Sequence, residues 1–511
     1  MNSSPGTKLE QSQEEHFRTD HLLKDIGHRA ISGGMITIAA QGAKFTLNFL
    51  AAAVLARLLG PNDFGLIGMV LGITGLVGVL KEMGLSTATV QRESITKQQV
   101  SNLFWINVAF SGVLTLISAV MAPLMAKFYH DPRVTAAMLA MSFTFLLTGS
   151  QVQHQALLAR QMRFHAVALI DAAALGIGFA VACILAWFGF GYWALVIQQL
   201  VYAGSGMVLT WCTSKWRPIG PTRNSGVLSM VKFGAHLTIA DFIGQTAINS
   251  DNILIGRYFG AEPLGLYTRA SLLLAKPIQQ VVTPISAVII PVLSRLQSDT
   301  ERYRRSYMRA YDTIALFIFS FSAVSLVLSK PLVLVVLGAK WKDSIPLFAA
   351  FTLVAISAPL SLICSWIYES QGRGKEQLRN HILAGSATFG SYVLGLHWGP
   401  IGVIYSIAVI SLLVRMPIVY YLAGRKGPVR TRDLWMGFVS HVPCWVTVFI
   451  ATSLVYKVLG NAAPIVQLFV CGPVGLAFGA ALFLLFPRPR RGAFYAWNTV
   501  KNKLLAAKAP A

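Results

Sequence analysis

Charged side chains, and acidic ones in particular, are scarce in this chain. Asp, Glu, Lys and Arg make up only 12% of its 511 residues, against roughly 25% in an ordinary globular protein. Hydrophobic residues account for 55%, and the mean hydropathy is +0.59. A soluble chain of this length would alternate apolar core segments with polar surface. The composition therefore excludes most soluble folds.

Cysteine is also rare and poorly placed for metal or disulfide chemistry. The five cysteines lie in or beside apolar stretches, without a CxxC pair and without histidine at ligand spacing; they are Cys183, Cys212, Cys364, Cys444 and Cys471. We expect buried small hydrophobic residues instead. The first 30 residues lack an apolar run and hold five acids, so they predict a cytosolic tail and neither a secretory signal nor a transit peptide.

Long apolar runs fill most of the remaining chain. A bilayer core of about 30 Å is crossed by about 20 apolar residues in a helix. The sequence predicts fourteen such spans, near 34–56, 65–86, 103–125, 134–157, 166–187, 192–213, 234–255, 267–291, 310–333, 345–368, 380–397, 402–423, 435–456 and 464–486. The expected fold is an all-α, polytopic integral membrane protein.

Lysine and arginine are distributed unequally between the two sides of these spans. With both termini on one side, that side holds 30 of the 43 basic residues and the opposite side holds 9. Because basic residues resist translocation, both termini are predicted to be cytoplasmic, in a cell inner membrane. The net charge of +23 is spread over short loops, which favours membrane lipids as partners and no nucleic acid.

The chain also contains a short internal sequence repeat. Shifted by 200 positions, the segments 56–66 and 256–266 share an Arg at 57/257, Gly at 60/260 and 65/265, and Leu at 66/266. This predicts two six-helix lobes related by a pseudo-twofold axis along the membrane normal, with two extra helices. The expected limits are a cytoplasmic tail at 1–30, lobes at 31–213 and 233–424, an inter-lobe loop at 214–232, two further helices at 425–486, and a basic cytoplasmic tail at 487–511.

Four segments carry a family resemblance. ARLLGPNDFGLIG at 56–68, GRYFGAEPLGLYTRA at 256–270, the proline-punctuated stretch at 277–299 and VLGAKWKDSIPLF at 336–348 resemble the Wzx-like polysaccharide exporters. These belong to the multidrug/oligosaccharidyl-lipid/polysaccharide exporter superfamily. The similarity covers residues from about 30 to 425.

The resemblance implies a two-lobed flippase rather than an enzyme. Such a protein moves undecaprenyl-pyrophosphate-linked repeat units to the periplasmic leaflet by alternating access, for lipopolysaccharide or exopolysaccharide biosynthesis. It implies a proton or sodium gradient as energy source and no cofactor. It also implies a polysaccharide polymerase and a chain-length regulator as partners. The acidic residue that precedes the Gly-Arg-x-x-Gly loop in this family is matched by Asp251.

Ionisable and polar residues inside the spans are candidates for the transport site, because each is costly unless it meets a cavity or a partner. Cations could offset the desolvation of a pyrophosphate; they are Lys44, Arg269, Lys276 and Arg415. Polar residues of the seventh and eighth spans could line the cavity or bind the coupling ion; they are Asp241, Gln245, Asn249, Asp251, Asn252 and Gln280.

Several alternatives stay open at this stage. Asp251 could form a static ion pair with Lys44 or Lys276 that only holds the helices together. Asp171 lies within about two turns of a cytoplasmic helix end, where its side chain can reach headgroups. A membrane enzyme would need a long outer loop or clustered catalytic residues, which are missing from the sequence. An ion-coupled drug or cation exporter of the same superfamily and a lipid II flippase remain the rival functions.

Overall fold

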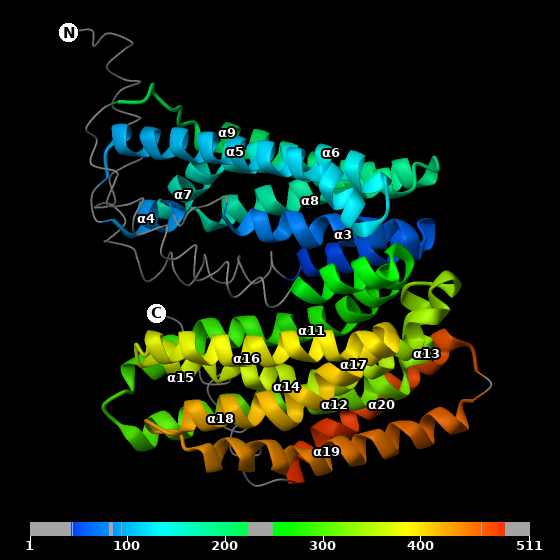
Figure 1. Ribbon diagram of the computed structural model, residues 1–511. Coiled ribbons are helices and arrows are strands. Elements are labelled where there is room, and N and C mark those ends of the chain that lie inside the picture. The colour runs from blue at the N-terminus through cyan, green and yellow to red at the C-terminus, as the bar shows by residue number, and fades with distance from the viewer. Residues whose placement is uncertain are drawn as a thin grey trace, which may run out of the picture. The chain divides into compact units, whose positions relative to one another are not determined.

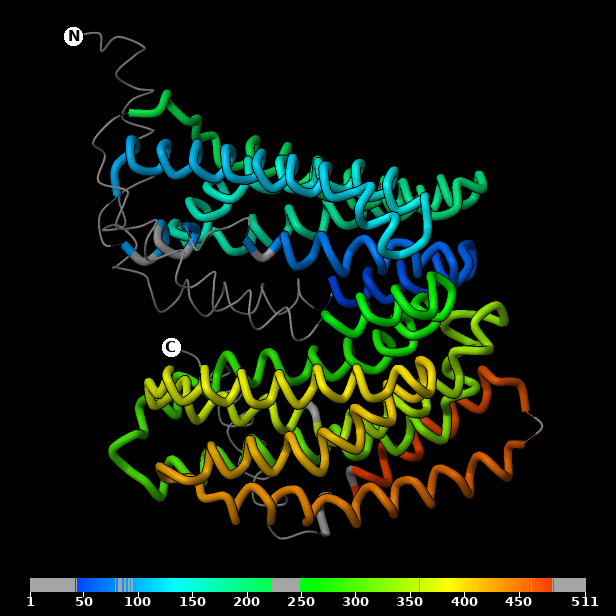
Figure 2. The backbone as a smooth tube through the Cα atoms, in the orientation of Figure 1, coloured from blue at the N-terminus to red at the C-terminus, as the bar shows by residue number. Residues whose placement is uncertain are grey.

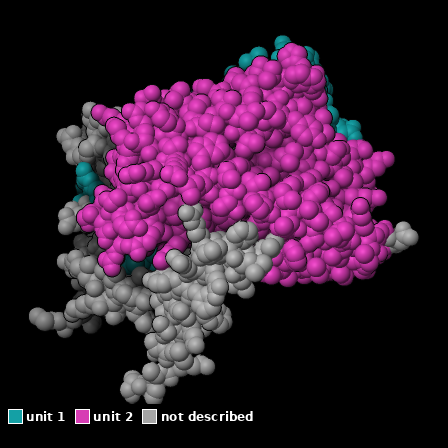
Figure 3. Space-filling view, turned by 90° about the horizontal axis from the view of Figure 1, so that it is seen from below, with its two compact units in different colours: residues 1–265 teal, residues 266–511 magenta. Residues whose placement is uncertain are grey.

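The computed structural model describes residues 42, 44–80, 85–92, 95–222, 249–460 and 462–485. Every regular element in these ranges is a helix (Figures 1 and 2). The chain forms two compact units, residues 1–265 and 266–511, which Figure 3 colours separately. The predicted limits of lobes, loop and tails stay predictions, because residues 223–248, which include the end of the expected inter-lobe loop and the start of the expected second lobe, lie outside the described ranges.

The first unit is built from a helix at 44–58, a helix at 249–259 and seven labelled helices between them. These are α3 (Pro61–Val79), α4 (Leu85–Gln91), α5 (Lys97–Tyr129), α6 (Arg133–Gly149), α7 (Val152–Arg160), α8 (Phe164–Trp187) and α9 (Tyr192–Ser214). Helix α11 (Ala261–Arg295) crosses the boundary between the units.

The second unit continues with α12 (Thr300–Val327), α13 (Ser329–Val336), η3 (Ala339–Ser344), α14 (Ile345–Ile363), α15 (Ser365–Ser370) and α16 (Gly374–Gly395). It ends with η4 (Leu396–Trp398), α17 (Gly399–Ile410), the π-helical turn η5 (Ser411–Arg415), α18 (Met416–Gly424), α19 (Thr431–Val458) and α20 (Pro464–Leu485).

The all-α, polytopic class and the fourteen-helix count are confirmed. By length and apolar composition, ten helices in the described ranges could cross a membrane, and one of them, residues 374–424, holds two expected spans. The shorter apolar helix α20 coincides with the span expected at 464–486. The span expected at 34–56 is described at residue 42 and from residue 44 onward, and the one at 234–255 only from residue 249 onward. Large apolar side chains such as Leu169, Ile184 and Trp187 of α8 are exposed, as expected for surfaces that meet lipid.

Local sequence signals set several helix ends. Pro61 occupies the first turn of α3, where its missing N–H costs nothing, and the Gly60 N–H donates to Asp63 Oδ2 at 3.0 Å. Thr96 caps α5 by accepting from the Gln99 N–H at 3.2 Å, and Gln99 accepts from the Thr96 N–H in return. This is the reciprocal capping box. It fixes the start of α5 at the edge of its apolar run.

Glycines let helix α3 approach the chain around residue 260 closely. A Cβ at Gly72 would lie 3.3 Å from the Ile253 side chain, and a Cβ at Gly256 would lie 3.1 Å from Met69 Cγ. A Cβ at Gly65 would meet the Ala261 backbone itself, 1.6 Å from its carbonyl oxygen. Small residues at such crossings are typical of helix packing in membranes. Within the first unit, the backbone of α3 at Gly65 therefore packs directly against the backbone at Ala261.

Helix α12 forms the centre of the second unit. Its buried tyrosines recur every four residues, and the Tyr311 and Tyr420 hydroxyls are hydrogen-bonded at 2.5 Å. The additional helices α19 and α20 pack on α12: Val324, Cys444 and Cys471 belong to one buried cluster. Cys364 is buried as well, but Cys183 is only half-buried and Cys212 is exposed. The expectation of five buried cysteines thus holds for three of them.

Candidate functional site

Lys44 has a partner that the sequence did not predict. Its Nζ donates to Asp171 Oδ2 of α8 at 2.8 Å, and 32% of each side chain is exposed. Tyr202 of α9 lies close enough to interact electrostatically with both charges. A static pair of Lys44 with Asp251 was one open alternative, and Asp171 was expected to reach lipid headgroups. The structure corrects both expectations, because Lys44 and Asp171 neutralise each other.

The short helix at 249–259 carries three of the predicted polar residues. Asn249, Asp251 and Asn252 are half-buried, and Asp251 Oδ1 accepts from the Asn252 N–H at 2.8 Å. Asn252 lies at the contact with α3, since a Cβ at Gly72 would be 3.8 Å from Asn252 Cβ. This face of the helix is therefore in part a packing surface. Two other polar residues predicted in the seventh span, Asp241 and Gln245, lie outside the described residues.

Helix α11 carries three of the predicted polar residues, and two of them are exposed. Lys276 and Gln280 are exposed and Arg269 is half-buried, while Leu274, Ile278 and Val282 on another face are buried. Within the described ranges no ion pair is formed by Lys276. An ammonium group in a membrane helix without a carboxylate partner requires water or an anionic ligand.

Arg415 lies in an irregular part of its span. It is the last residue of the π-helical turn between α17 and α18, and its side chain is half-buried. The guanidinium Nε has no hydrogen-bond partner among the described residues. Single π-helical turns inside α-helices often occur at functional sites. Neither apolar periodicity nor length could have revealed this turn.

The structure thus sorts the predicted cations by environment. Lys44 is paired in the first unit, whereas Arg269 and Lys276 share α11 and Arg415 lies on a separate helix of the second unit. The described ranges hold no group of three or more His, Cys, Asp or Glu side chains arranged for a metal ion. The arrangement can bind an anion by charge and hydrogen bonding. Asp171 is the residue that sequence reasoning missed, although its position inside an apolar run is itself a signal.

The sequence is similar to that of proteins from bacterial polysaccharide biosynthesis. Residues 54–346 match the family model described as polysaccharide biosynthesis protein. The chain is 24% identical over 336 residues to the teichuronic acid biosynthesis protein TuaB of Bacillus subtilis, covering 65% of this chain and 70% of TuaB. It is 25% identical to the succinoglycan biosynthesis transport protein ExoT of Rhizobium meliloti, covering 64% of this chain and 66% of ExoT.

Two solved structures share the fold. The lipid II flippase MurJ in an inward closed conformation superposes with a TM-score of 0.68 at 13% identity, covering 89% of this chain and 99% of MurJ. An inward-facing multidrug resistance transporter of the MATE family superposes with a TM-score of 0.56 at 16% identity, covering 79% and 95%. At these identities the likeness concerns the fold alone.

Proposed function

The chain belongs to the family of polysaccharide biosynthesis proteins, and from this premise we propose that it is a flippase for lipid-linked oligosaccharides. Its cargo is an undecaprenyl-pyrophosphate-linked repeat unit, which it moves from the cytoplasmic to the periplasmic leaflet by alternating access. Relatives named for teichuronic acid biosynthesis and for succinoglycan transport support this class of cargo. A polysaccharide polymerase and a chain-length regulator are its proposed partners.

The observation that carries the proposal is the exposed Lys276 on α11. The charge of a pyrophosphate must be compensated inside a membrane, and a cation that no carboxylate of the described ranges neutralises can do so through charge-assisted hydrogen bonds. Arg269 and Arg415 would add planar guanidinium groups, which suit phosphate oxygens. The exposed Gln280 one turn beyond Lys276 would contact the neutral part of the cargo.

We assign the coupling to a proton or sodium ion to acidic residues of the membrane helices. Asp241 and Asp251 are the first candidates from the sequence. Asp171 is a third, because protonation of its carboxylate would release the Lys44 ammonium from their 2.8 Å contact. A gradient-driven change at Asp171 would then expose a further cation to the cargo.

Replacing Lys276 tests the proposal directly. Lys276→Ala should lower the flipping rate of a fluorescent pyrophosphate-linked oligosaccharide in proteoliposomes by about tenfold or more, since a hydrogen bond to a charged group contributes about 1.5–3 kcal/mol. Lys276→Arg, which keeps the charge, should retain most of the rate. Lys342→Ala is the matched control, because Lys342 is also an exposed lysine of the second unit but belongs to η3. Unaltered flipping by Lys276→Ala would refute the proposed site.

The same vesicles separate the rival functions. An ion-coupled drug or cation exporter would accumulate a cationic dye and would not respond to Lys276→Ala by losing pyrophosphate transport. A lipid II flippase would move lipid II at a rate comparable to the oligosaccharide carrier. The MATE and MurJ structures share only the fold with this chain, so neither rival has a specific observation in its favour.

A further inference from the structure

Three helices of the second unit begin at one end of that unit and are joined there by polar contacts. Gln297, before α12, donates to the Ser370 carbonyl oxygen, before α16. Arg373 Nη1 donates to the Lys426 carbonyl oxygen, before α19, at 2.9 Å. The starts of α12, α16 and α19 therefore form one surface. In the predicted topology this end faces the cytoplasm.

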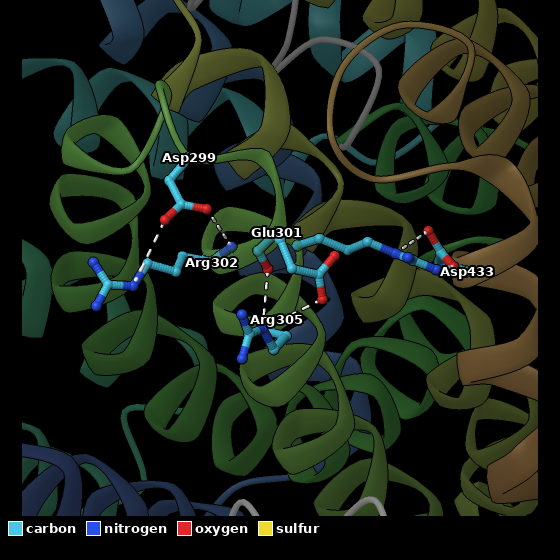
Figure 4. Close-up of polar contacts among 6 residues, drawn as sticks. Asp299, Glu301, Arg302, Arg305 and Asp433 are labelled. Atoms are coloured by element: carbon cyan, nitrogen blue, oxygen red, sulfur yellow. Dashed lines mark hydrogen bonds and ion pairs between the residues drawn. The ribbon is translucent and has the colours of Figure 1, made fainter.

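Most acids at this end are already neutralised by an arginine, as Figure 4 shows for three of them. Arg302 Nε lies 3.6 Å from Asp299 Oδ2, and Arg305 Nε lies 3.3 Å from Glu301 Oε1. The Arg304 guanidinium binds Asp433 through both carboxylate oxygens.

The remaining two acids differ, because only Glu376 forms ion pairs. Glu376 contacts Arg373 and lies 3.5 Å from Lys426 Nζ. Glu369 accepts a hydrogen bond from the Gln377 side chain at 3.1 Å. Glu369 is exposed and keeps its charge, so within the described part of the unit one carboxylate of this end is left to compensate further positive charge.

Besides Arg430, whose backbone N–H donates to Asp433 Oδ2, five further cations of this end are exposed and form no ion pair within the described ranges. They are Arg295, Lys375, Arg379, Arg425 and Arg432. We name these five residues the cationic end face. Like charges gathered without counter-charges repel one another, so an anion that binds among them is stabilised by all of them.

We propose that the cationic end face binds the phosphate headgroups of anionic phospholipids in the cytoplasmic leaflet. The exposed guanidinium groups match phosphate oxygens in geometry and charge. They are spread over the end of α11, the start of α16, and the turn into α19 with that helix's start, which suits several separate headgroups better than one buried ligand. Each basic residue near an anionic membrane surface strengthens binding by about fivefold. This surface is independent of the cargo and of Lys276.

The alternative is that these residues only set the topology during insertion and make no lasting lipid contact. A triple variant distinguishes the two. Lys375→Gln, Arg425→Gln and Arg432→Gln together remove three charges from the cationic end face. The matched control, Lys330→Gln with Lys342→Gln and Lys457→Gln, removes three charges from exposed lysines of α13, of η3 and of the far end of α19.

Native mass spectrometry of the purified full chain measures the affinity for phosphatidylglycerol, phosphatidylcholine and an isoprenyl pyrophosphate without sugar. We expect the wild type to prefer phosphatidylglycerol over phosphatidylcholine by at least about tenfold. The effects of the individual basic residues would multiply to a larger preference, but salt screening weakens each of them. The end-face triple variant should lose about tenfold in phosphatidylglycerol affinity, and the control variant less than about twofold. Unchanged elution and unfolding temperature verify that both variants are folded.

Three results would overturn the proposal. They are equal affinity for the two phospholipids, equal loss in the two triple variants, and a loss confined to the isoprenyl pyrophosphate. The last would assign the surface to capture of the cargo. Failure of this proposal leaves the Lys276 test untouched, because that test measures flipping and this one measures lipid binding.

Discussion

Gly65 packs against the backbone of Ala261, four residues before Gly265, and Gly265 packs against the backbone of Pro61, four residues before Gly65. A Cβ on Gly65 would lie 1.6 Å from the Ala261 carbonyl oxygen, and a Cβ on Gly265 would lie 1.9 Å from the Pro61 carbonyl oxygen. Ala261 follows Pro61 by 200 positions, as Gly265 follows Gly65. Contacts exchanged in this way are the mark of a two-fold relation. The two segments that echo one another in sequence therefore meet around a local two-fold axis.

Alanine at either glycine should destabilise the protein. The obstructing atoms are backbone atoms, which cannot turn aside as a flexible side chain can, so we expect Gly65→Ala and Gly265→Ala each to cost about 1–3 kcal/mol of unfolding free energy. The measurement is the thermal unfolding midpoint of the purified protein in detergent.

The control for this prediction lies on the same helix. Gly75 of α3 has nothing within 4 Å of an added Cβ, so Gly75→Ala should be neutral or stabilising by up to about 1 kcal/mol, from helix propensity alone. Equal unfolding midpoints for Gly65→Ala and Gly75→Ala would show that the close approach is absent.

The contact between α3 and the helix at 249–259 can also be trapped by a disulfide. A Cβ at Gly72 lies 3.8 Å from Asn252 Cβ, within the 3.5–4.5 Å that disulfides span. After replacement of the five native cysteines by serine, Gly72→Cys with Asn252→Cys should cross-link under mild oxidation, as detected by mass spectrometry of the linked peptides. Gly75→Cys with Asn252→Cys should remain reduced. Equal cross-linking of the two pairs would mean that this helix does not pack on α3.

Apolar run length predicted the helices well, because a bilayer demands the same length and composition of every span. It could not predict interruptions inside a span. The span expected at 134–157 is divided into α6 and α7, and the one at 402–423 contains the π-helical turn that ends at Arg415. A change in the pattern of backbone hydrogen bonds within a continuous apolar run cannot be predicted from the amino-acid composition of that run.

Charge placement was predicted in part. The sequence singled out Lys44 as a costly intramembrane cation but could not find its partner, which lies 127 positions away on α8. Pairing depends on the rotation and depth of two helices, and neither is encoded locally. The echo between 56–66 and 256–266 likewise predicted a duplication but not that Gly65 and Gly265 would exchange backbone contacts. Tertiary packing decides both.

The Lys44–Asp171 pair yields the last prediction. If a proton on Asp171 couples the gradient to transport, Asp171→Asn should abolish the acceleration of flipping by a pH gradient in proteoliposomes, because the amide cannot take up a proton. A basal rate without a gradient should persist, since Lys44 keeps its charge. The measurement compares initial flipping rates with and without the imposed gradient.

Asp131→Asn is the matched control, because Asp131 also forms an ion pair, with Arg133 at 2.7 Å, but in the turn between α5 and α6. Both variants weaken an ion pair whose shortest N···O distance is similar, 2.7 Å for Asp131 and 2.8 Å for Asp171, so the loss of an ion pair is common to both. The gradient response should survive in Asp131→Asn and vanish in Asp171→Asn. If it survives in both, Asp171 serves only to hold the helix at 44–58 against α8, and the coupling ion must bind at another acid.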